Sequence, residues 1–211
     1  MNPIEKLKNG FERFKNEFHE TNSQKSVEYT KLVKEGQQPK ILMIACSDSR
    51  VAPEILFHVD PGDLFTVRNI ANLVPPYEMD GHRHGVSAAI EYAVDYLRVE
   101  HIIVKGHANC GGIAALMKKG AVGDFISPWM SISNKAREEV LNVFPDLTDE
   151  EKRSACEKAS ILVSLENLLT FPFVKDKHEG GKLRIHGWYF DMNKGELLSF
   201  HQESKRFQKI R

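Results

Sequence analysis

The fold of this chain is decided by one stretch, ILMIACSDSR at residues 41–50. Five apolar residues, with no polar interruption, lead directly into a cysteine, a carboxylate and a guanidinium. This pattern predicts a buried strand that delivers reactive side chains at its carboxyl end. We therefore expect the chemistry of the protein where this strand stops.

A second stretch, HIIVKGHANCGG at residues 101–112, has the same build. If the two strands are parallel in one sheet, the side chains of Cys46, His107 and Cys110 converge at the same edge. Two thiols and one imidazole supply three of the four corners of a tetrahedral zinc site. The two glycines after Cys110 allow a tight turn into a helix, and the first amides of such a helix can donate to a developing anion.

The segment between these strands predicts how they are connected. Along residues 86–97, apolar residues fall on one helical face and polar residues on the other, which is typical of a crossover helix. Another strand is predicted at residues 64–67, and residues 183–189 and 197–200 are typical of a C-terminal hairpin. We expect an α/β fold with a central, mostly parallel β-sheet flanked by helices, in which ligands sit at the carboxyl ends of the strands.

Composition limits the classes of function. The chain has 211 residues, 41% apolar and 27% charged, which is typical of a single globular domain. Its 29 basic and 29 acidic residues cancel, so we expect neither nucleic acid nor membranes as partners. The amino terminus is too polar for a signal peptide, and no apolar run approaches the ~20 residues of a bilayer span, which predicts a cytoplasmic protein. In that reducing compartment three cysteines suit metal binding or catalysis better than disulfides.

Residues 1–36 are expected to form a helical arm ahead of an α/β core at residues 37–211. Such an arm can pack within its own chain or against a partner subunit, and spacing alone does not choose between the two. Its first helix carries a narrow apolar stripe, called here the amino-terminal seam, which consists of Ile4, Leu7, Phe11, Phe14 and Phe18.

The residues alone leave alternatives to a catalytic zinc site open. Cys46 could act as a nucleophile with His107 as its base, which leaves Cys110 without a role. Cys156 could close a structural metal site, although it lies early in a predicted helix with no neighbouring ligand. Two histidines in the polar loop at residues 77–84 are most simply solvated, but a proton-carrying histidine would also suit such a place.

Several stretches of the chain resemble the β-class carbonic anhydrases. The resemblance is close from residue 37 to about residue 116 and looser elsewhere. It implies a zinc-dependent lyase that hydrates carbon dioxide reversibly to bicarbonate and a proton, with zinc-bound hydroxide as the attacking group. The motifs that carry the resemblance are CSDSR at 46–50, RNIAN at 68–72, residues 85–92, GHANCGG at 106–112 and HGW at 186–188.

The resemblance also implies roles for individual residues. Cys46, His107 and Cys110 match the zinc ligands of the family. Asp48 and Arg50 match its catalytic dyad. The residues that match the substrate-binding site are Gln37, Phe65, Ile70, Tyr92 and Gly111, the last through its backbone amide.

The family is built from homodimers that often assemble further, with amino-terminal helices around the partner and part of the cleft supplied by the neighbour. The resemblance therefore favours an intersubunit role for the amino-terminal seam. Met43 stands where bicarbonate-regulated members carry tryptophan, which places the chain closer to the plant-like subgroup. Ala108 stands where many members have serine, which removes a hydroxyl but no ligand.

Two further questions concern the site that the resemblance implies. Because two thiolates already neutralise Zn²⁺, an ion pair between Asp48 and Arg50 can compete with coordination by Asp48, and we expect an open fourth position near neutral pH. The same ligands could also serve hydrolysis of carbon disulfide or carbonyl sulfide, which are small, linear and apolar. A non-catalytic zinc-binding structural or sensor domain is the third possibility, and it would leave the dyad without a purpose.

Overall fold

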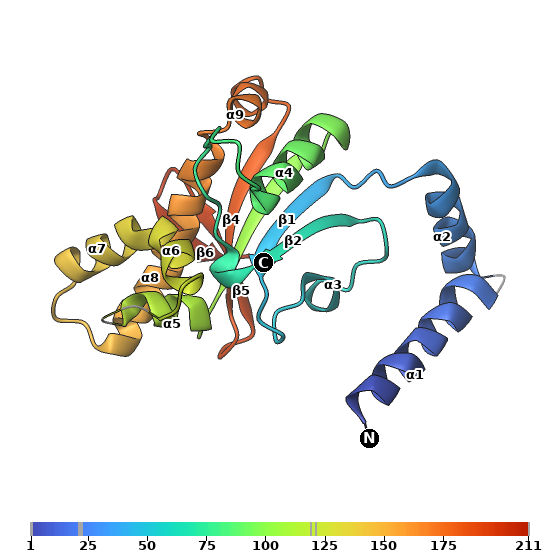
Figure 1. Ribbon diagram of the computed structural model, residues 1–211, viewed down its shortest axis with the longest axis horizontal. Coiled ribbons are helices and arrows are strands. Elements are labelled where there is room, and N and C mark those ends of the chain that lie inside the picture. Colours follow the sequence, from blue (N-terminus) through green and yellow to red (C-terminus); the bar gives the residue numbers. More distant parts are fainter. Residues whose placement is uncertain (1, 21–22, 119, 121, 211) are drawn as a thin grey trace. The chain divides into compact units, whose positions relative to one another are not determined.

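The computed structural model of the protein describes residues 2–20, 23–118, 120 and 122–210. The chain forms two compact units, Met1–Gln38 and Pro39–Arg211 (Figure 1). The first unit is helical, and the second contains the β-sheet. Within the described part of the chain, no helix is both long enough and apolar enough to cross a membrane.

The amino-terminal unit consists of α1 (Pro3–Lys15), a π-helical turn (Asn16–Glu20) and α2 (Gln24–Glu35). Both α-helices begin at a residue whose side chain accepts a hydrogen bond from the first turn, Asn2 for α1 and Ser23 for α2. Such caps satisfy backbone N–H groups that have no partner inside the helix. Local sequence therefore defines the start of each helix.

The amino-terminal seam divides into two parts. The rings of Phe14 and Phe18 pack on each other and on Tyr29 of α2, with centroids 4.7 to 5.5 Å apart. The other members are exposed, at 57% for Ile4, 70% for Leu7 and 61% for Phe11. The first half of α1 thus presents an exposed apolar surface.

The strands of the second unit form a six-stranded sheet in the order β2-β1-β3-β4-β5-β6. Neighbours from β2 to β4 are parallel, and β5 and β6 are antiparallel. The predicted mostly parallel sheet is confirmed, and the predicted C-terminal hairpin is joined by a further strand, β6, that its short polar sequence did not indicate. The strands are β1 (Ile41–Cys46), β2 (Leu64–Asn69), β3 (His101–His107), β4 (Arg184–Asp191), β5 (Glu196–His201) and β6 (Arg206–Lys209).

Helices connect and cover the strands, and α5 to α8 gather on one side of the sheet (Figure 1). The crossover helix predicted at residues 86–97 is an α-helix, α4, that continues into a π-helical turn at Tyr92–Tyr96. The α-helices are α3 (Pro53–Leu56), α4 (Gly85–Glu91), α5 (Gly111–Met117), α6 (Ile126–Met130), α7 (Asn134–Val143), α8 (Asp149–Leu168) and α9 (Pro172–Glu179), with 3₁₀ turns at Ile70–Asn72 and Ser131–Ser133.

The main core lies between one face of the sheet and three helical segments. Leu42 of β1 and Ile102 of β3 are fully buried there, together with Ile90 of α4, Ile161 of α8 and Val174 of α9. A second buried cluster, with members from α5 to α8, surrounds the carboxyl ends of β1 and β3. The predicted site at the ends of these strands is therefore bordered by tightly packed apolar side chains.

Two glycines allow α8 to lie directly on the sheet. A Cβ atom on Gly106 of β3 would lie 2.7 Å from the Cδ1 atom of Ile161, and one on Gly187 of β4 would lie 2.9 Å from its Cγ2 atom. Real Cβ atoms do not approach other heavy atoms this closely, and protein interiors are close-packed. The absence of both side chains therefore sets the distance between α8 and the sheet.

Replacing Gly106 with alanine should lower the free energy of unfolding by about 1–3 kcal/mol, because the added methyl group overlaps a buried isoleucine. Urea unfolding followed by circular dichroism measures the change. Gly85→Ala is the matched control, since nothing lies within 4 Å of its added Cβ atom. Equal stabilities for the two variants would contradict the close approach of α8.

Candidate metal centre

The structure brings three predicted ligands together at the carboxyl ends of two neighbouring strands. Cys46 is the last residue of β1, His107 is the last residue of β3, and Cys110 immediately precedes α5. One ligand atom from each residue lies within 4.8 Å of the other two, and all three side chains are buried. Around a tetrahedral zinc ion with Zn–S bonds of about 2.3 Å, sulfurs lie roughly 3.8 Å apart, so the cluster has the size of such a site.

The histidine of this cluster is oriented as a ligand. Its Nδ1 atom lies 2.8 Å from the carbonyl oxygen of Ala108, which fixes Nδ1 as the N–H donor. Its Nε2 atom is buried and has no hydrogen-bond partner among the described residues. A buried polar atom without a partner is unfavourable, whereas an imidazole whose other nitrogen is held by a carbonyl is the usual arrangement in metal sites. His107 therefore fits a metal.

The two thiols also have the chemistry of metal ligands. The pKa of Cys46 is lowered from its usual value, first because the Cys110 thiol donates a hydrogen bond to it, and further because His107 lies beside it. The same hydrogen bond, together with burial, raises the pKa of Cys110. Thiolate sulfur and imidazole nitrogen form the donor set that zinc prefers. The residues present therefore fit zinc.

Cys156 and Asp48 lie outside this cluster. Cys156 is buried in α8, with its Sγ atom 4.0 Å from the Oγ atom of Ser160, and burial raises its pKa to about 11. Among the described residues, Cys156 belongs to no group of three His, Cys, Asp or Glu side chains that could hold a metal. The geometry gives no support to the alternative in which Cys156 closes a structural site.

Asp48 and Arg50 form a bidentate ion pair beside the cluster. The Nε atom of Arg50 donates to Oδ1 of Asp48 at 2.9 Å and its Nη2 atom donates to Oδ2 at 2.6 Å. The backbone N–H of Arg50 donates to the same Oδ1 at 2.9 Å. These hydrogen bonds hold the pKa of Asp48 well below its usual range, so the carboxylate is ionised at neutral pH.

The loop that carries this pair is held in place by another arginine. Arg68 of β2 donates from Nε to the carbonyl oxygen of Cys46 at 3.0 Å and from Nη2 to that of Asp48 at 2.7 Å. A guanidinium presents its donors in a fixed, planar fork, so two such contacts define the path of the backbone. The RNIAN motif thus supports the CSDSR motif physically.

The five residues that match the substrate-binding site lie in different places. Ile70 and Gly111 are close to the cluster, since a Cβ atom on Gly112 would lie 2.8 Å from the Cγ2 atom of Ile70. The rings of Phe65 and Tyr92 pack on each other 5.8 Å apart, and Tyr92 is 45% exposed. Gln37 belongs to the amino-terminal unit.

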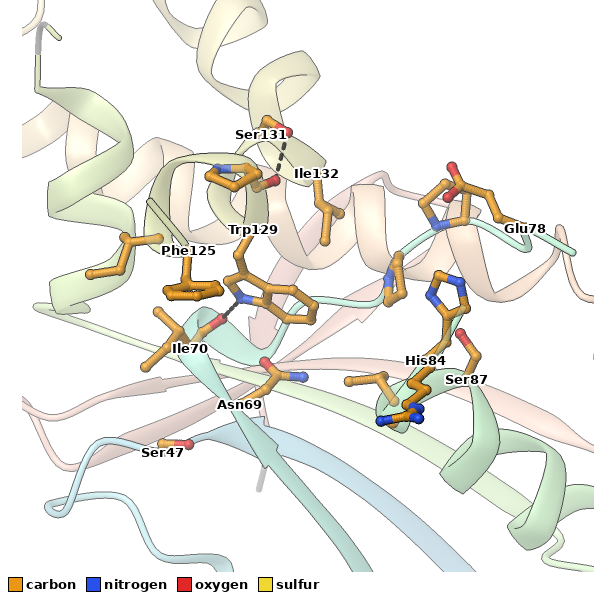
Figure 2. Close-up of a pocket in the computed structure, with 17 residues that line it drawn as sticks. Ser47, Asn69, Ile70, Glu78, His84, Ser87, Phe125, Trp129, Ser131 and Ile132 are labelled. Carbon is orange, nitrogen blue, oxygen red and sulfur yellow. Dashed lines mark hydrogen bonds between the residues drawn. The ribbon is translucent and has the colours of Figure 1, made fainter. Parts of the chain in front are cut away.

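A pocket of about 880 Å³ opens next to Ile70 (Figure 2). Figure 2 shows Phe125 and Trp129 beside Ile70, with His84 and Ser87 across the pocket. The indole Nε1 atom of Trp129 donates to the carbonyl oxygen of Ile70 at 2.8 Å. Nothing in the spacing of residues 125–132 indicated that they would line a pocket.

Comparison with known proteins agrees with this geometry. A model of the carbonic anhydrase family matches residues 41–197, more than half of the chain. The chain belongs to the carbonic anhydrase family. Among solved structures, the β-carbonic anhydrase CcaA superposes with a TM-score of 0.89 at 30% identity, covering 99% of this chain and 92% of that one. A tetrameric β-carbonic anhydrase from Sordaria macrospora gives 0.77 at 27% identity, covering 93% and 94%.

Curated relatives from Arabidopsis thaliana confirm the predicted β class and plant-like subgroup. Beta carbonic anhydrase 3 is 40% identical over 203 residues, which cover 92% of this chain and 76% of the relative. Beta carbonic anhydrase 5, chloroplastic, is 47% identical over 167 residues, which cover 78% of this chain. This chain spans 55% of the length of that second relative.

Lys105 is a buried cation of this carbonic anhydrase family member that the sequence did not indicate. Lys105 of β3 is 0% exposed, its Nζ atom donates to the carbonyl oxygen of Val51 at 2.9 Å, and it lies over the ring of Phe57. It forms no salt bridge with any residue that the structure describes. Burial, assisted by the charge of Arg68, lowers the pKa of Lys105 to about 8. The signal was a lysine inside an otherwise apolar strand.

Protein stability should therefore depend on pH through Lys105. The pKa of Lys105 is about 8 in the folded chain, below its ordinary value of 10.5 in the unfolded chain. At a pH between these two values the lysine takes up a proton when the chain unfolds, so the free energy of unfolding rises with pH. Relative to Lys105→Met, the wild type should gain about 2 kcal/mol of unfolding free energy between pH 8 and pH 10. Urea unfolding of both proteins at several pH values measures the difference. If the unfolding free energies of the wild type and of Lys105→Met change with pH in parallel, burial does not lower the pKa of Lys105.

Proposed function

We propose that this protein is a carbonic anhydrase that uses zinc to interconvert carbon dioxide and water with bicarbonate and a proton. The observation that carries the proposal is the convergence of Cys46, His107 and Cys110. The buried Nε2 atom of His107 has no hydrogen-bond partner among the described residues. These three residues would hold Zn²⁺ and leave one coordination position free. Zinc held by three protein ligands supplies a Lewis acid that makes water nucleophilic near neutral pH.

Asp48 is proposed to orient the water that attacks carbon dioxide. The carboxylate is ionised at neutral pH and can accept one further hydrogen bond. Because both of its oxygens already accept from Arg50, the ion pair competes with coordination of the metal by Asp48. Arg50 therefore keeps Asp48 available as an acceptor and keeps a coordination position free.

The apolar surface beside the cluster suits an uncharged substrate. Ile70 lies against the Cys110–Gly112 turn, and its carbonyl is fixed by Trp129. Gly111 follows the ligand Cys110 directly, so its amide is a proposed donor to the oxygen atoms of carbon dioxide or bicarbonate. The family resemblance assigns Gln37, Phe65 and Tyr92 to the same cleft, and we propose that a second copy of the chain presents them.

We further propose that the protein is a homo-oligomer. The ring of Tyr92 is stacked on that of Tyr96 with centroids 5.4 Å apart, and the two are 45% and 72% exposed. The first half of α1 presents a second exposed apolar surface, formed by Ile4, Leu7 and Phe11. Apolar patches of this kind mark association sites. A neighbour in structure, from Sordaria macrospora, is tetrameric.

The proposed compartment is the cytoplasm. All three cysteines of the chain are free, and two of them belong to the proposed ligand set. Cysteine ligands must stay reduced to bind zinc, and a reducing compartment ensures this.

Measurement of zinc content and of carbon dioxide hydration tests the proposed function. The wild type should hold about one zinc per chain and hydrate carbon dioxide, and Cys110→Ser should lose most of both because it removes one of three protein ligands. Elemental analysis and stopped-flow hydration with a pH indicator provide the two readouts. Cys156→Ser, which alters a buried cysteine outside the cluster, is the matched control.

Full zinc occupancy in Cys110→Ser would refute the ligand set. Preferential turnover of carbonyl sulfide or carbon disulfide would reassign the substrate.

Removal of residues 1–20 should weaken self-association, because it removes the exposed apolar surface of α1. Sedimentation velocity at several protein concentrations measures the change. Replacing Leu7 and Phe11 together with serine should have the same effect while leaving Phe14 and Phe18 packed on Tyr29. If both variants keep the mass and melting temperature of the wild type, the seam does not serve an interface.

A further inference from the structure

Two polar side chains of α8 reach the loop that carries the proposed metal ligands. Arg153 and Glu157 are four residues apart, so they project from the same side of the helix on successive turns. The side chain of Glu157 is only 2% exposed, and that of Arg153 is 32% exposed. Ionisable residues are rarely buried this deeply without a specific partner. Neither residue belongs to the ligand set or to the Asp48–Arg50 dyad.

Glu157 holds the backbone of a proposed ligand. Its Oε1 atom accepts a hydrogen bond from the backbone N–H of Cys110 at 3.0 Å, and its Oε2 atom accepts one from the hydroxyl of Tyr189 at 2.8 Å. Cys110 precedes the first turn of α5, so no carbonyl of α5 can accept from its N–H. Without the carboxylate, that buried N–H would lose its partner. The position of the Cys110 backbone, and with it the sulfur, therefore depends on Glu157.

Arg153 acts on the same loop at the preceding residue. Its Nη2 atom donates to Oδ1 of Asn109 at 3.1 Å, and Asn193 accepts from the amide nitrogen of the same side chain at 3.1 Å. Asn109 adopts a left-handed backbone conformation with φ of 58°. A non-glycine residue in this region persists only where its surroundings hold it.

The carbonyl of Asn109 links this contact to the dyad. It accepts a hydrogen bond from the Nη2 atom of Arg50 at 3.2 Å, the same nitrogen that bonds Oδ2 of Asp48. A change in the conformation of Asn109 would therefore displace the guanidinium that holds Asp48. One helix thus contacts the ligand side of the site through Glu157 and the dyad side through Arg153.

We propose that Arg153 and Glu157 are positioning residues, Glu157 for the metal ligand Cys110 and Arg153, through Asn109, for the Asp48–Arg50 pair. This inference rests on the proposed function, since it assigns a purpose to each contact in a zinc-dependent hydration. It predicts that the two residues have different effects. Changes at position 157 alter metal binding, and changes at position 153 alter turnover while metal binding is retained.

Glu157→Gln tests the first assignment. The amide keeps the size of the side chain, but its NH₂ group must face either the N–H of Cys110 or the hydroxyl of Tyr189, so one contact is lost. Zinc affinity, measured by competition with a chromogenic chelator, should fall about 10- to 100-fold. Glu166→Gln removes a charge from an exposed position on the same helix and is the matched control, with affinity expected to stay within about twofold.

A second variant separates positioning from folding. Glu157→Asp keeps the charge but shortens the side chain by one methylene, which withdraws the carboxylate from Cys110, so zinc affinity should fall here as well. Melting temperatures in excess chelator report the stability of each protein without its metal. If both variants melt lower but bind zinc as tightly as Glu166→Gln, Glu157 is a structural core residue and the first assignment fails.

Arg153→Met tests the second assignment. It should reduce kcat about tenfold through misplacement of the dyad, with KM and zinc affinity within about twofold of the wild type. Arg153→Lys, which can still donate to Asn109, should recover most of the turnover. Unchanged kcat in Arg153→Met, or no recovery in Arg153→Lys, would overturn this assignment.

The outcomes distinguish this inference from the proposed function. If the wild type binds zinc but does not hydrate carbon dioxide, the proposed function fails, and the affinity of Glu157→Gln still decides whether the residue positions the metal ligand. If the wild type hydrates carbon dioxide while zinc affinity is unchanged in both Glu157 variants, the proposed function stands and the positioning of Cys110 fails.

Discussion

The parallel pairing of β1 with β3 is the constraint on which the rest of this structure depends. The two strands run in register from Ile41 opposite His101 to Ala45 opposite Lys105, so that both end at the same edge of the sheet. Cys46 and His107 thereby become neighbours although they are far apart in the sequence. A sheet with the strands antiparallel would place these side chains at opposite ends. Every later feature of the site, from the dyad loop to the start of α5, follows from this shared edge.

The packing of α8 on the sheet extends the same constraint to a second layer. Gly106 and Gly187 let Ile161 approach the backbone of β3 and β4, and this contact fixes where the helix lies. One turn before Ile161, the buried Glu157 meets the backbone of Cys110. Core packing and site geometry are therefore two consequences of one helix position, and the stability of the fold and the shape of the site are not independent properties.

The sequence predicted the parts of this structure that depend on local pattern. Continuous apolar runs identified β1 and β3, and the residues at their ends predicted a shared cluster, because strand direction alone determines which side chains meet. It did not predict β6, whose sequence at Arg206–Lys209 is short and polar, and it missed the π-helical turn at Tyr92–Tyr96, whose apolar spacing is the same as that of an α-helix. Contacts between distant segments were also missed. Glu157 with Cys110 is such a contact, since a glutamate in a helix is typical of a solvated surface.

The helical geometry of α8 fixes the position of Glu157 at the site relative to that of Ile161 in the core. Each residue of an α-helix is rotated by about 100° from the one before it. A single inserted or deleted residue between Glu157 and Ile161 would therefore turn the polar contacts away from the ligand loop if the isoleucine kept its place on the sheet. Changes of chain length can be absorbed before Thr148, where the helix has not begun, but not within this turn. The spacing of four residues between Glu157 and Ile161 in α8 therefore fixes the ligand loop relative to the core, and both contacts can be kept only if changes of chain length fall in the loops.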